Sequence, residues 1–272
     1  MEYQERVSEL FDAVAATYDS VGVEFFKPIA SGLVEALDPR PGDRTVDIGC
    51  GRGAVLFRLA SAVGPTGSVT GLDLSPRMVG ATALDVTHSG LDIDVRVGDG
   101  MAPGLPLEAF DVVASSLVLF FLPDPMAALR AWRGLLVESG RVGVSTFGPY
   151  DHRWGNTVDP VLRAHAPAEV IDARSTGRQG PFGSDEGMEK LLVDAGFRQV
   201  RTVSSVVAPR FDDCEQWYDW SMSVGQRQFW ETVPDERLDE VKAAVFAAVS
   251  ECRDAEGRIG FDQHVRYTLG VR

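Results

Sequence analysis

The sequence predicts a doubly wound α/β fold, and three observations predict it. Strand-like and helix-like segments alternate between residues 44 and 147, as they do in a mostly parallel sheet with helices on both faces. A glycine-rich turn follows the first strand, and acidic residues stand at the ends of successive strands, where open α/β sheets bind ligands. The strands are expected to end near residues 48, 73, 99, 117 and 147, with helices near 53–63, 76–89 and 124–138.

Further elements are expected on both sides of this alternating region. Val7, Leu10 and Val14 recur at helical spacing, and Ile29 and Leu33 do so again, which predicts two helices before the first strand. The downstream part is expected to add a helix at 184–195, a sixth strand at 198–209 and a last strand at 264–271.

The turn after the first strand combines an acid with three glycines. Gly49, Gly51 and Gly53 let the backbone turn tightly and admit a ligand against the following helix. A dinucleotide site would place a pyrophosphate at this turn, and the carboxylate of Asp47 would repel it. S-adenosylmethionine (SAM) carries an ammonium and a sulfonium group and no phosphate, so Asp47 favours SAM as the ligand.

Two more acids extend the same site. Asp73, with Leu74 beside it, ends the second strand about twenty residues after the glycine turn, where a carboxylate can accept both ribose hydroxyls. This spacing also occurs in nicotinamide enzymes, so it indicates only an adenosine-type ligand. After the third strand, Asp99 can accept a hydrogen bond from the adenine amino group beside Gly100 and the apolar Met101.

Each of these residues also has a purely structural interpretation. The glycines can serve a strand-to-helix turn alone, and Asp99 can be a turn acid. Asp73 can cap the helix that begins near residue 76, although Ser75 fills that position better. Ser116 ends the fourth strand at the carboxyl edge of the sheet, which adds one more side chain to the same crevice.

With these motifs, residues 10–147 resemble the class I SAM-dependent methyltransferases, and within them the small-molecule branch of the ubiquinone and menaquinone methyltransferases. The resemblance implies that the acid and glycines of the first turn hold the methionine part of SAM. It implies that Asp73 takes the ribose and that Asp99 and Met101 border the adenine. Residues 11–19 resemble the N-terminal segment of that family, whose tyrosine often lies over the cofactor, and this implies the same place for Tyr18.

The resemblance also implies a seven-stranded, mostly parallel, Rossmann-like sheet in which the last strand lies antiparallel beside the sixth. N-terminal helices and a helical cap are expected around it. The expected segments are N-terminal helices on the substrate side (1–40), a SAM-binding core (41–147), an insertion near the substrate (148–183), a continued core (184–210), a helical aromatic cap (211–256) and a C-terminal core strand (257–272).

Substrate residues are expected outside the sheet, because loops at its carboxyl edge carry specificity. The aromatic candidates are Tyr150 and Trp154 in the insertion and Trp217 and Trp220 in the cap, although any one of them can equally pack these segments onto the sheet. His152 is a candidate general base, and Tyr18 is a second candidate for a catalytic role. Methyl transfer needs alignment more than covalent help, so catalytic residues leave little trace in a sequence.

The composition of the chain limits the classes of partner and the location that are expected. A formal net charge of −14 argues against DNA or RNA, because phosphate backbones require a basic surface. No apolar run approaches the roughly 20 residues that span a bilayer, and three scattered cysteines fit a reduced cytoplasm and no metal site. Apolar faces on the N-terminal helices would suit a homo-oligomer or packing on their own sheet.

The sequence therefore predicts an enzyme that uses SAM as its cofactor and moves a methyl group to O, N or C of a lipophilic small molecule, expected to be a specialised metabolite. The first alternative is a SAM-binding enzyme that transfers no methyl, such as a cyclase on the same fold. A nicotinamide oxidoreductase is the second alternative, which Asp47 and the lack of a paired Ser/Tyr/Lys catalytic set disfavour.

Overall fold

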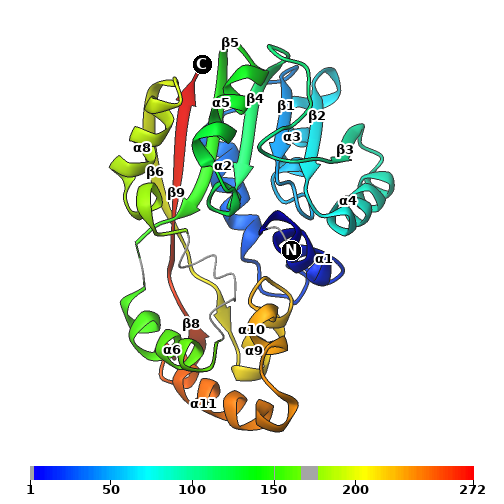
Figure 1. The fold of residues 1–272 in the computed structure, drawn as a ribbon. Helices are drawn as coiled ribbons and strands as arrows, with labels where there is room; N and C mark the ends of the chain where they lie inside the picture. The colour runs from blue at the N-terminus through cyan, green and yellow to red at the C-terminus, as the bar shows by residue number, and fades with distance from the viewer. Residues whose placement is uncertain (1–2, 150, 167–176) are drawn as a thin grey trace.

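The computed structural model describes residues 3–149, 151–166 and 177–272. Its centre is a seven-stranded sheet in the order β3-β2-β1-β4-β5-β9-β6 (Figure 1). The strands are β1 (Arg44–Ile48), β2 (Ser68–Asp73), β3 (Ile93–Val97), β4 (Phe110–Ser116), β5 (Leu136–Phe147), β6 (Arg198–Val207) and β9 (Gln263–Val271).

The directions of the strands agree with the expected topology. The first five strands run parallel to one another, so their carboxyl ends meet at one edge of the sheet. β9 lies antiparallel between β5 and β6, with Ser145 opposite Tyr267 and Val203 opposite Tyr267 on the other side. The seven-stranded sheet with one antiparallel insertion is thus confirmed.

Helices cover both faces of this sheet. In Figure 1, α2 lies behind the strands and α5 lies in front of them. Around the sheet are α1 (Tyr3–Val14), α2 (Phe26–Leu37), α3 (Leu56–Val63), α4 (Pro76–Ser89), α5 (Pro125–Leu135) and α8 (Asp185–Asp194). The two helices expected before the first strand are therefore present as α1 and α2, and the core helices lie close to their expected ranges.

The boundary between α5 and β5 differs most from the expectation. The helix expected at 124–138 ends at Leu135, and β5 begins at Leu136 instead of Arg141. Leu136 pairs with Phe110 at the start of β4, and the register shifts between Phe110 and Val112. Pairing with β4 therefore extends β5 back over residues 136–138, which the sequence pattern had assigned to the helix.

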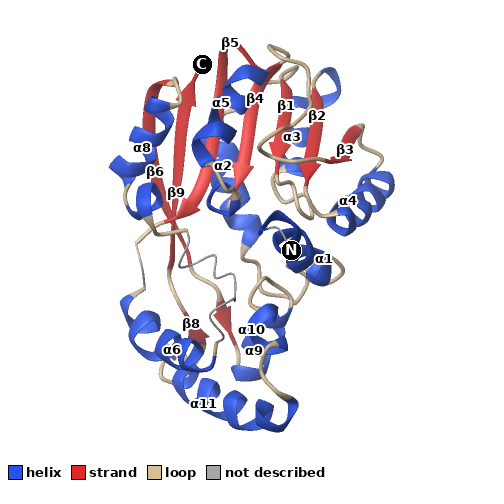
Figure 2. Cartoon of the chain, viewed as in Figure 1, coloured by secondary structure: helices blue, strands red, loops and turns tan. Residues whose placement is uncertain are grey.

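A second lobe lies beyond the carboxyl edge of the sheet (Figure 2). It contains α6 (His152–His165), α9 (Cys214–Met222), α10 (Arg227–Glu231), α11 (Leu238–Ser250) and a small ribbon of β7 (Arg210–Phe211) with β8 (Ile259–Gly260). We call this lobe the cap. Its core is aromatic: the Trp154 ring lies 4.8 Å from Phe261 and 5.9 Å from Trp217, measured between ring centroids. Such contacts between rings stabilise the cap beyond simple burial of their area.

Candidate functional site

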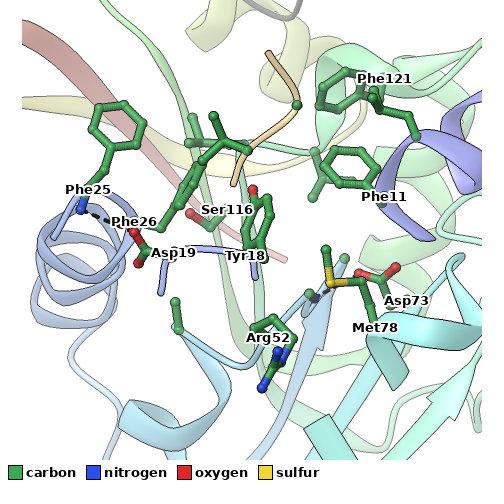
Figure 3. A pocket seen from close by; sticks show the side chains of 18 of the residues that line it. Phe11, Tyr18, Asp19, Phe25, Phe26, Arg52, Asp73, Met78, Ser116 and Phe121 are labelled. Atoms are coloured by element: carbon green, nitrogen blue, oxygen red, sulfur yellow. Dashed lines mark hydrogen bonds between the residues drawn. The ribbon is translucent and has the colours of Figure 1, made fainter. Parts of the chain in front are cut away.

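A cavity of about 1200 Å³ lies between the carboxyl edge of the sheet, α1 and the cap. Its wall on the sheet side includes the glycine turn and the ends of β2 and β4. Figure 3 shows Phe11, Tyr18, Asp73 and Ser116 around this space. The cavity is therefore where open α/β folds bind their ligands.

The three glycines of the turn differ in what surrounds them. All have positive φ angles, +77° at Gly49, +48° at Gly51 and +81° at Gly53. A Cβ atom on Gly49 would come within 2.2 Å of Val118, so Gly49 is required by packing. A Cβ atom on Gly51 would meet no atom within 4 Å, although Gly51 lines the cavity. The backbone at Gly51 is thus left bare toward a ligand, as the ligand interpretation of the turn requires.

Asp47 is buried at the cavity floor. Only 1% of its surface is exposed, and its Oδ1 atom has no hydrogen-bond partner within the described residues. Burial, together with the nearby charge of Asp73, raises the pKa of Asp47 to about 8. A buried carboxyl oxygen without a partner beside an open cavity fits a cationic group such as the ammonium of SAM.

Asp73 ends β2 and faces the cavity. Its Oδ2 accepts the backbone N–H of Gly51 at 2.8 Å, and its Oδ1 accepts that of Ser75 at 2.9 Å. Burial raises its pKa, and these two hydrogen bonds oppose that rise. The N-cap of α4 is Ser75, whose hydroxyl accepts the N–H of Met78 at 3.0 Å. Asp73 is therefore free of the capping role and retains acceptor capacity on both oxygens.

Asp99 follows β3 by two residues. Its Oδ1 accepts the backbone N–H of Met101 at 2.8 Å, and its Oδ2 accepts the side-chain amide of Gln4 at 3.1 Å. Asp99 and Gly100 line the cavity. The Met101 side chain packs against the core and does not line the cavity, so it approaches the site only through its backbone.

Tyr18 and Ser116 both line the cavity. The Tyr18 ring stacks on Phe26 with centroids 4.7 Å apart, and burial with the charges of Asp19 and Asp73 raises its pKa. A phenol with a raised pKa stays protonated at neutral pH, which argues against Tyr18 as a general base. The Ser116 hydroxyl lies 2.8 Å from that of Ser145.

The cap residues expected to contact substrate divide into two groups. Trp154 and Trp220 line the cavity, and Phe261 lies between them. Trp217 is wholly buried and does not line the cavity, because it packs behind Trp154 and against Trp230. We therefore assign Trp217 to packing.

Two expectations remain, His152 as a general base and Tyr150 as a substrate contact. His152 is exposed in the first turn of α6 and does not line the cavity, so it is not placed to act as a base there. Tyr150 lies outside the described residues.

Several lining residues were not expected from the sequence. Gln4 of α1, Asp19 before α2, and Phe120 with Phe121 after β4 all line the cavity. Asp19 has a left-handed backbone, with φ of 53°, and its carboxylate accepts the N–H of Phe25 at 3.4 Å. Asp19 could have been found from the sequence because it directly follows Tyr18. The sequence around Gln4 contains nothing that indicates a place in the cavity.

The described residues hold neither a membrane-spanning helix nor a metal-binding cluster. No helix among them is long and apolar enough to cross a membrane. Within 3–149, 151–166 and 177–272, no cluster of three or more His, Cys, Asp or Glu side chains is arranged to hold a metal ion.

Comparison with known proteins identifies the family. Residues 46–144 match the family described as methyltransferase domain. Nocamycin O-methyltransferase from Saccharothrix syringae is 36% identical over an alignment of 273 positions, which covers 96% of this chain and 96% of that protein. Aklanonic acid methyltransferase DauC from Streptomyces sp. (strain C5) is 41% identical over 145 residues, which cover 53% of this chain and 66% of that protein.

A solved structure extends the comparison to the whole fold. The crystal structure of the 4+2 cyclase SpnF has a TM-score of 0.60 at 18% identity and covers 98% of this chain and 96% of that one. At this identity the likeness shows the fold alone. The full-length similarity to a curated methyltransferase confirms the resemblance found in the sequence. The chain belongs to the class I SAM-dependent methyltransferases, in their small-molecule branch.

Proposed function

We propose that this methyltransferase moves the methyl group of SAM to an oxygen of a bulky, lipophilic specialised metabolite. Transfer to oxygen is supported by nocamycin O-methyltransferase, which is similar over nearly the full length of both chains. A bulky lipophilic acceptor is supported by the aromatic wall that the cap turns toward the cavity, with Trp154, Trp220 and Phe261. Transfer to N or C remains compatible with the same cavity.

The size of the cavity is the observation that carries the proposal. A site for one small ligand typically occupies about 300 to 1000 Å³, and this cavity has about 1200 Å³. Its sheet side is acidic, with Asp47, Asp73 and Asp99, and its cap side is aromatic. One continuous space with two chemically different ends fits a cationic cofactor and an apolar acceptor held face to face.

The positions of the three acids support the cofactor side of the proposal. We propose that Asp47 neutralises the ammonium of the methionine part while the bare backbone of Gly51 lies against it, and that Asp73 accepts the ribose hydroxyls. Asp99 would accept from the adenine amino group beside Gly100. The remaining members of the proposed cofactor site are Gly49, Gly53, Leu74, Ser116 and Tyr18, with Met101 contributing its backbone alone.

SAM supplies an activated methyl group on a sulfonium, so the displacement requires no covalent help from the protein. The chain orients the acceptor: Trp154 and Trp220 hold its apolar body, and α1 with Phe11 and Phe121 covers the site and excludes water. None of the histidines among the described residues lines the cavity. We therefore propose that the acceptor oxygen is acidic enough to react without a strong protein base.

The segment assignments stay part of this proposal. Residues 1–40, 148–183 and 211–256 would carry the acceptor side, whereas 41–147, 184–210 and 257–272 would carry the sheet and the cofactor. We also propose a cytoplasmic location, supported by three cysteines that form no disulfide. A homo-oligomer is supported by the exposed Val203 and Val206 on the edge strand β6, and light scattering would measure it.

Calorimetric titration of the purified protein with SAM, S-adenosylhomocysteine (SAH) and NADH tests the cofactor. We expect binding of SAM and SAH and none of NADH. Asp73→Ala should weaken SAH binding by about 1 to 3 kcal/mol, since charge-assisted hydrogen bonds to the ribose are lost. Asp94→Ala is the control, because Asp94 is an exposed acid paired with Arg96 on β3 and does not line the cavity. Silence toward both SAM and SAH would overturn the proposal.

A product screen then separates methyl transfer from the alternative. Incubation with SAM and oxygenated lipophilic acceptors, aklanonic acid among them, should give a mass gain of one methylene and an equal amount of SAH. A SAM-binding cyclase would change the acceptor without a gain in mass and without forming SAH. The cyclase alternative is tested because the fold of this chain is similar to that of SpnF. At 18% identity, this similarity supports no shared activity.

A further inference from the structure

Helix α1 closes one side of the cofactor end of the cavity. Gln4, in its first turn, lines the cavity together with Asp99, which lies 95 residues away in the sequence. The side-chain amide of Gln4 donates to Asp99 Oδ2 with N and O 3.1 Å apart. The first turn of α1 is thus joined to the carboxylate that the proposed function assigns to adenine.

Three further contacts fix α1 over the site. The Ser8 hydroxyl donates to the carbonyl of Leu74 at 3.3 Å, and Asp12 accepts the backbone N–H of Arg77 at 3.0 Å. Val14 of α1 is fully buried and belongs to one apolar cluster with Met78 of α4. Because these contacts lie along the whole helix, the position of Gln4 depends on more than its own hydrogen bond.

The far end of α1 is held from two sides. Arg52 of the glycine turn donates to the carbonyl of Ala15 at 2.6 Å, just after the helix. Arg227 of α10 donates to the carbonyl of Ala13 at 3.1 Å. One end of α1 therefore contacts both the floor of the cofactor site and the cap.

The hydrogen bonds at Asp99 leave room for a ligand. Each carboxylate oxygen accepts up to about two hydrogen bonds, and here Oδ1 accepts from Met101 and Oδ2 from Gln4. The two bonds fix the plane of the carboxylate while Oδ2 keeps a free lone pair. The amide of Gln4 also keeps one N–H and its oxygen, a donor and an acceptor side by side. The polar edge of adenine offers the complementary pair, an amino group and a ring nitrogen.

We propose that Gln4 is part of the adenine subsite: it fixes the carboxylate of Asp99 toward the amino group and gives the base a second polar contact. The inference rests on the proposed function, since it assumes that Asp99 binds adenine. It makes α1 a part of cofactor recognition as well as a cover. Selectivity for adenine over a 6-oxo purine then depends on a residue that the core sequence motifs do not include.

The test measures binding of SAH and of S-inosylhomocysteine, in which an oxo group replaces the adenine amino group. Titrations compare the full-length protein with Gln4→Ala and with Gln4→Met, which keeps the length of the side chain and its fit in α1. Glu9→Ala is the matched control, because Glu9 lies on the same helix, is exposed and does not line the cavity.

We expect Gln4→Ala and Gln4→Met to weaken SAH binding about three- to tenfold, as for one net hydrogen bond. Binding of S-inosylhomocysteine should change less than about twofold in both, and Glu9→Ala should match the unmodified protein for both ligands. Unchanged SAH affinity, tighter SAH binding, or equal loss for both ligands would overturn the role of Gln4. Failure of the unmodified protein to bind SAH would overturn the proposed function and this inference with it, a result distinct from a defect confined to the variants.

Discussion

The carboxyl group of Asp47 is buried beside Asp73, and burial together with that neighbouring charge raises the pKa of Asp47 to about 8. Two acids this close are costly in a protein that binds no cation, because each charge opposes the other in a medium of low polarity. A ligand that brings positive charge to the same place would offset this cost. It also makes proton transfer a direct readout of cofactor binding.

Binding of SAM at pH 7 should release a proton from Asp47. At this pH the Asp47 carboxyl group is mostly protonated, and a cationic ligand favours its ionised form. SAM affinity should therefore rise as pH increases toward about pH 8, while the ammonium of SAM stays protonated. Calorimetry at pH 7 in two buffers of different ionisation enthalpy measures the proton. Asp47→Asn should show equal heats in both buffers, and equal heats in the unmodified protein would contradict the assignment.

The same shift predicts how stability depends on pH without ligand. The pKa of Asp47 is 3.8 in its ordinary state and about 8 in the folded chain, so between these values the folded state holds more protons than the unfolded state. The contribution of Asp47 is complete below pH 3.8 and is lost as pH rises toward 8. Chemical unfolding from pH 5 to pH 9 should show a shallower fall for Asp47→Asn than for the unmodified protein. Parallel curves would show that the group is ionised in the fold.

Gly51 and Gly49 should respond differently to alanine. Gly51→Ala adds a methyl group in open space on a turn that lines the cavity, so we expect a stability loss of about 1 to 2 kcal/mol and loss of most SAH affinity. Gly49→Ala should destabilise the fold more, because its Cβ meets Val118 at 2.2 Å. Thermal unfolding and SAH titration separate the two effects.

Gly90→Ala supplies the control for backbone strain. Gly90 also has a positive φ and open surroundings, yet it lies outside the cavity at the end of α4. Gly90→Ala should destabilise the fold about as much as Gly51→Ala does, and it should keep the SAH affinity of the unmodified protein. Normal SAH binding by Gly51→Ala would show that the ligand does not approach this turn.

Substitution of Trp220 and of Trp217 in the cap should have different effects. Trp220→Phe changes the wall of the cavity, so we expect a higher KM for the acceptor and unchanged SAH affinity. Trp217→Phe is the matched variant behind the wall and should lower the unfolding temperature with the KM unchanged. Steady-state kinetics with an acceptor from the product screen and thermal unfolding measure both. A KM effect of equal size in the two variants would mean that the cap acts only as a folded unit.

The order of strands and helices in the core was predictable because each element carries its own periodicity and its own termination signal. Ser75, for example, was expected as the N-cap of α4 from its local pattern, and its hydroxyl makes that bond. The carboxylates of Asp47, Asp73 and Asp99 were also expected at the sheet edge, because parallel strands bring their ends together.

The cap and α1 were less predictable for a physical reason. Trp154 and Trp217 have no local difference that tells which one reaches the cavity, since that depends on packing between α6 and α9. Gln4 is one more polar residue on an amphipathic helix until the fold brings it to Asp99. Contacts between distant segments decide both cases, and a pattern read along the chain does not contain them.

The two arginine contacts at the end of α1 have a kinetic consequence. Arg52 ties this end to the cofactor floor and Arg227 ties it to the cap, so displacing the helix loosens both ends of the cavity together. Spent cofactor would then leave through the same opening movement that frees the acceptor. An acceptor with two reactive oxygens would be released between the two transfers, so singly methylated product should accumulate before any doubly methylated product forms. In this enzyme, methylation is expected to be distributive.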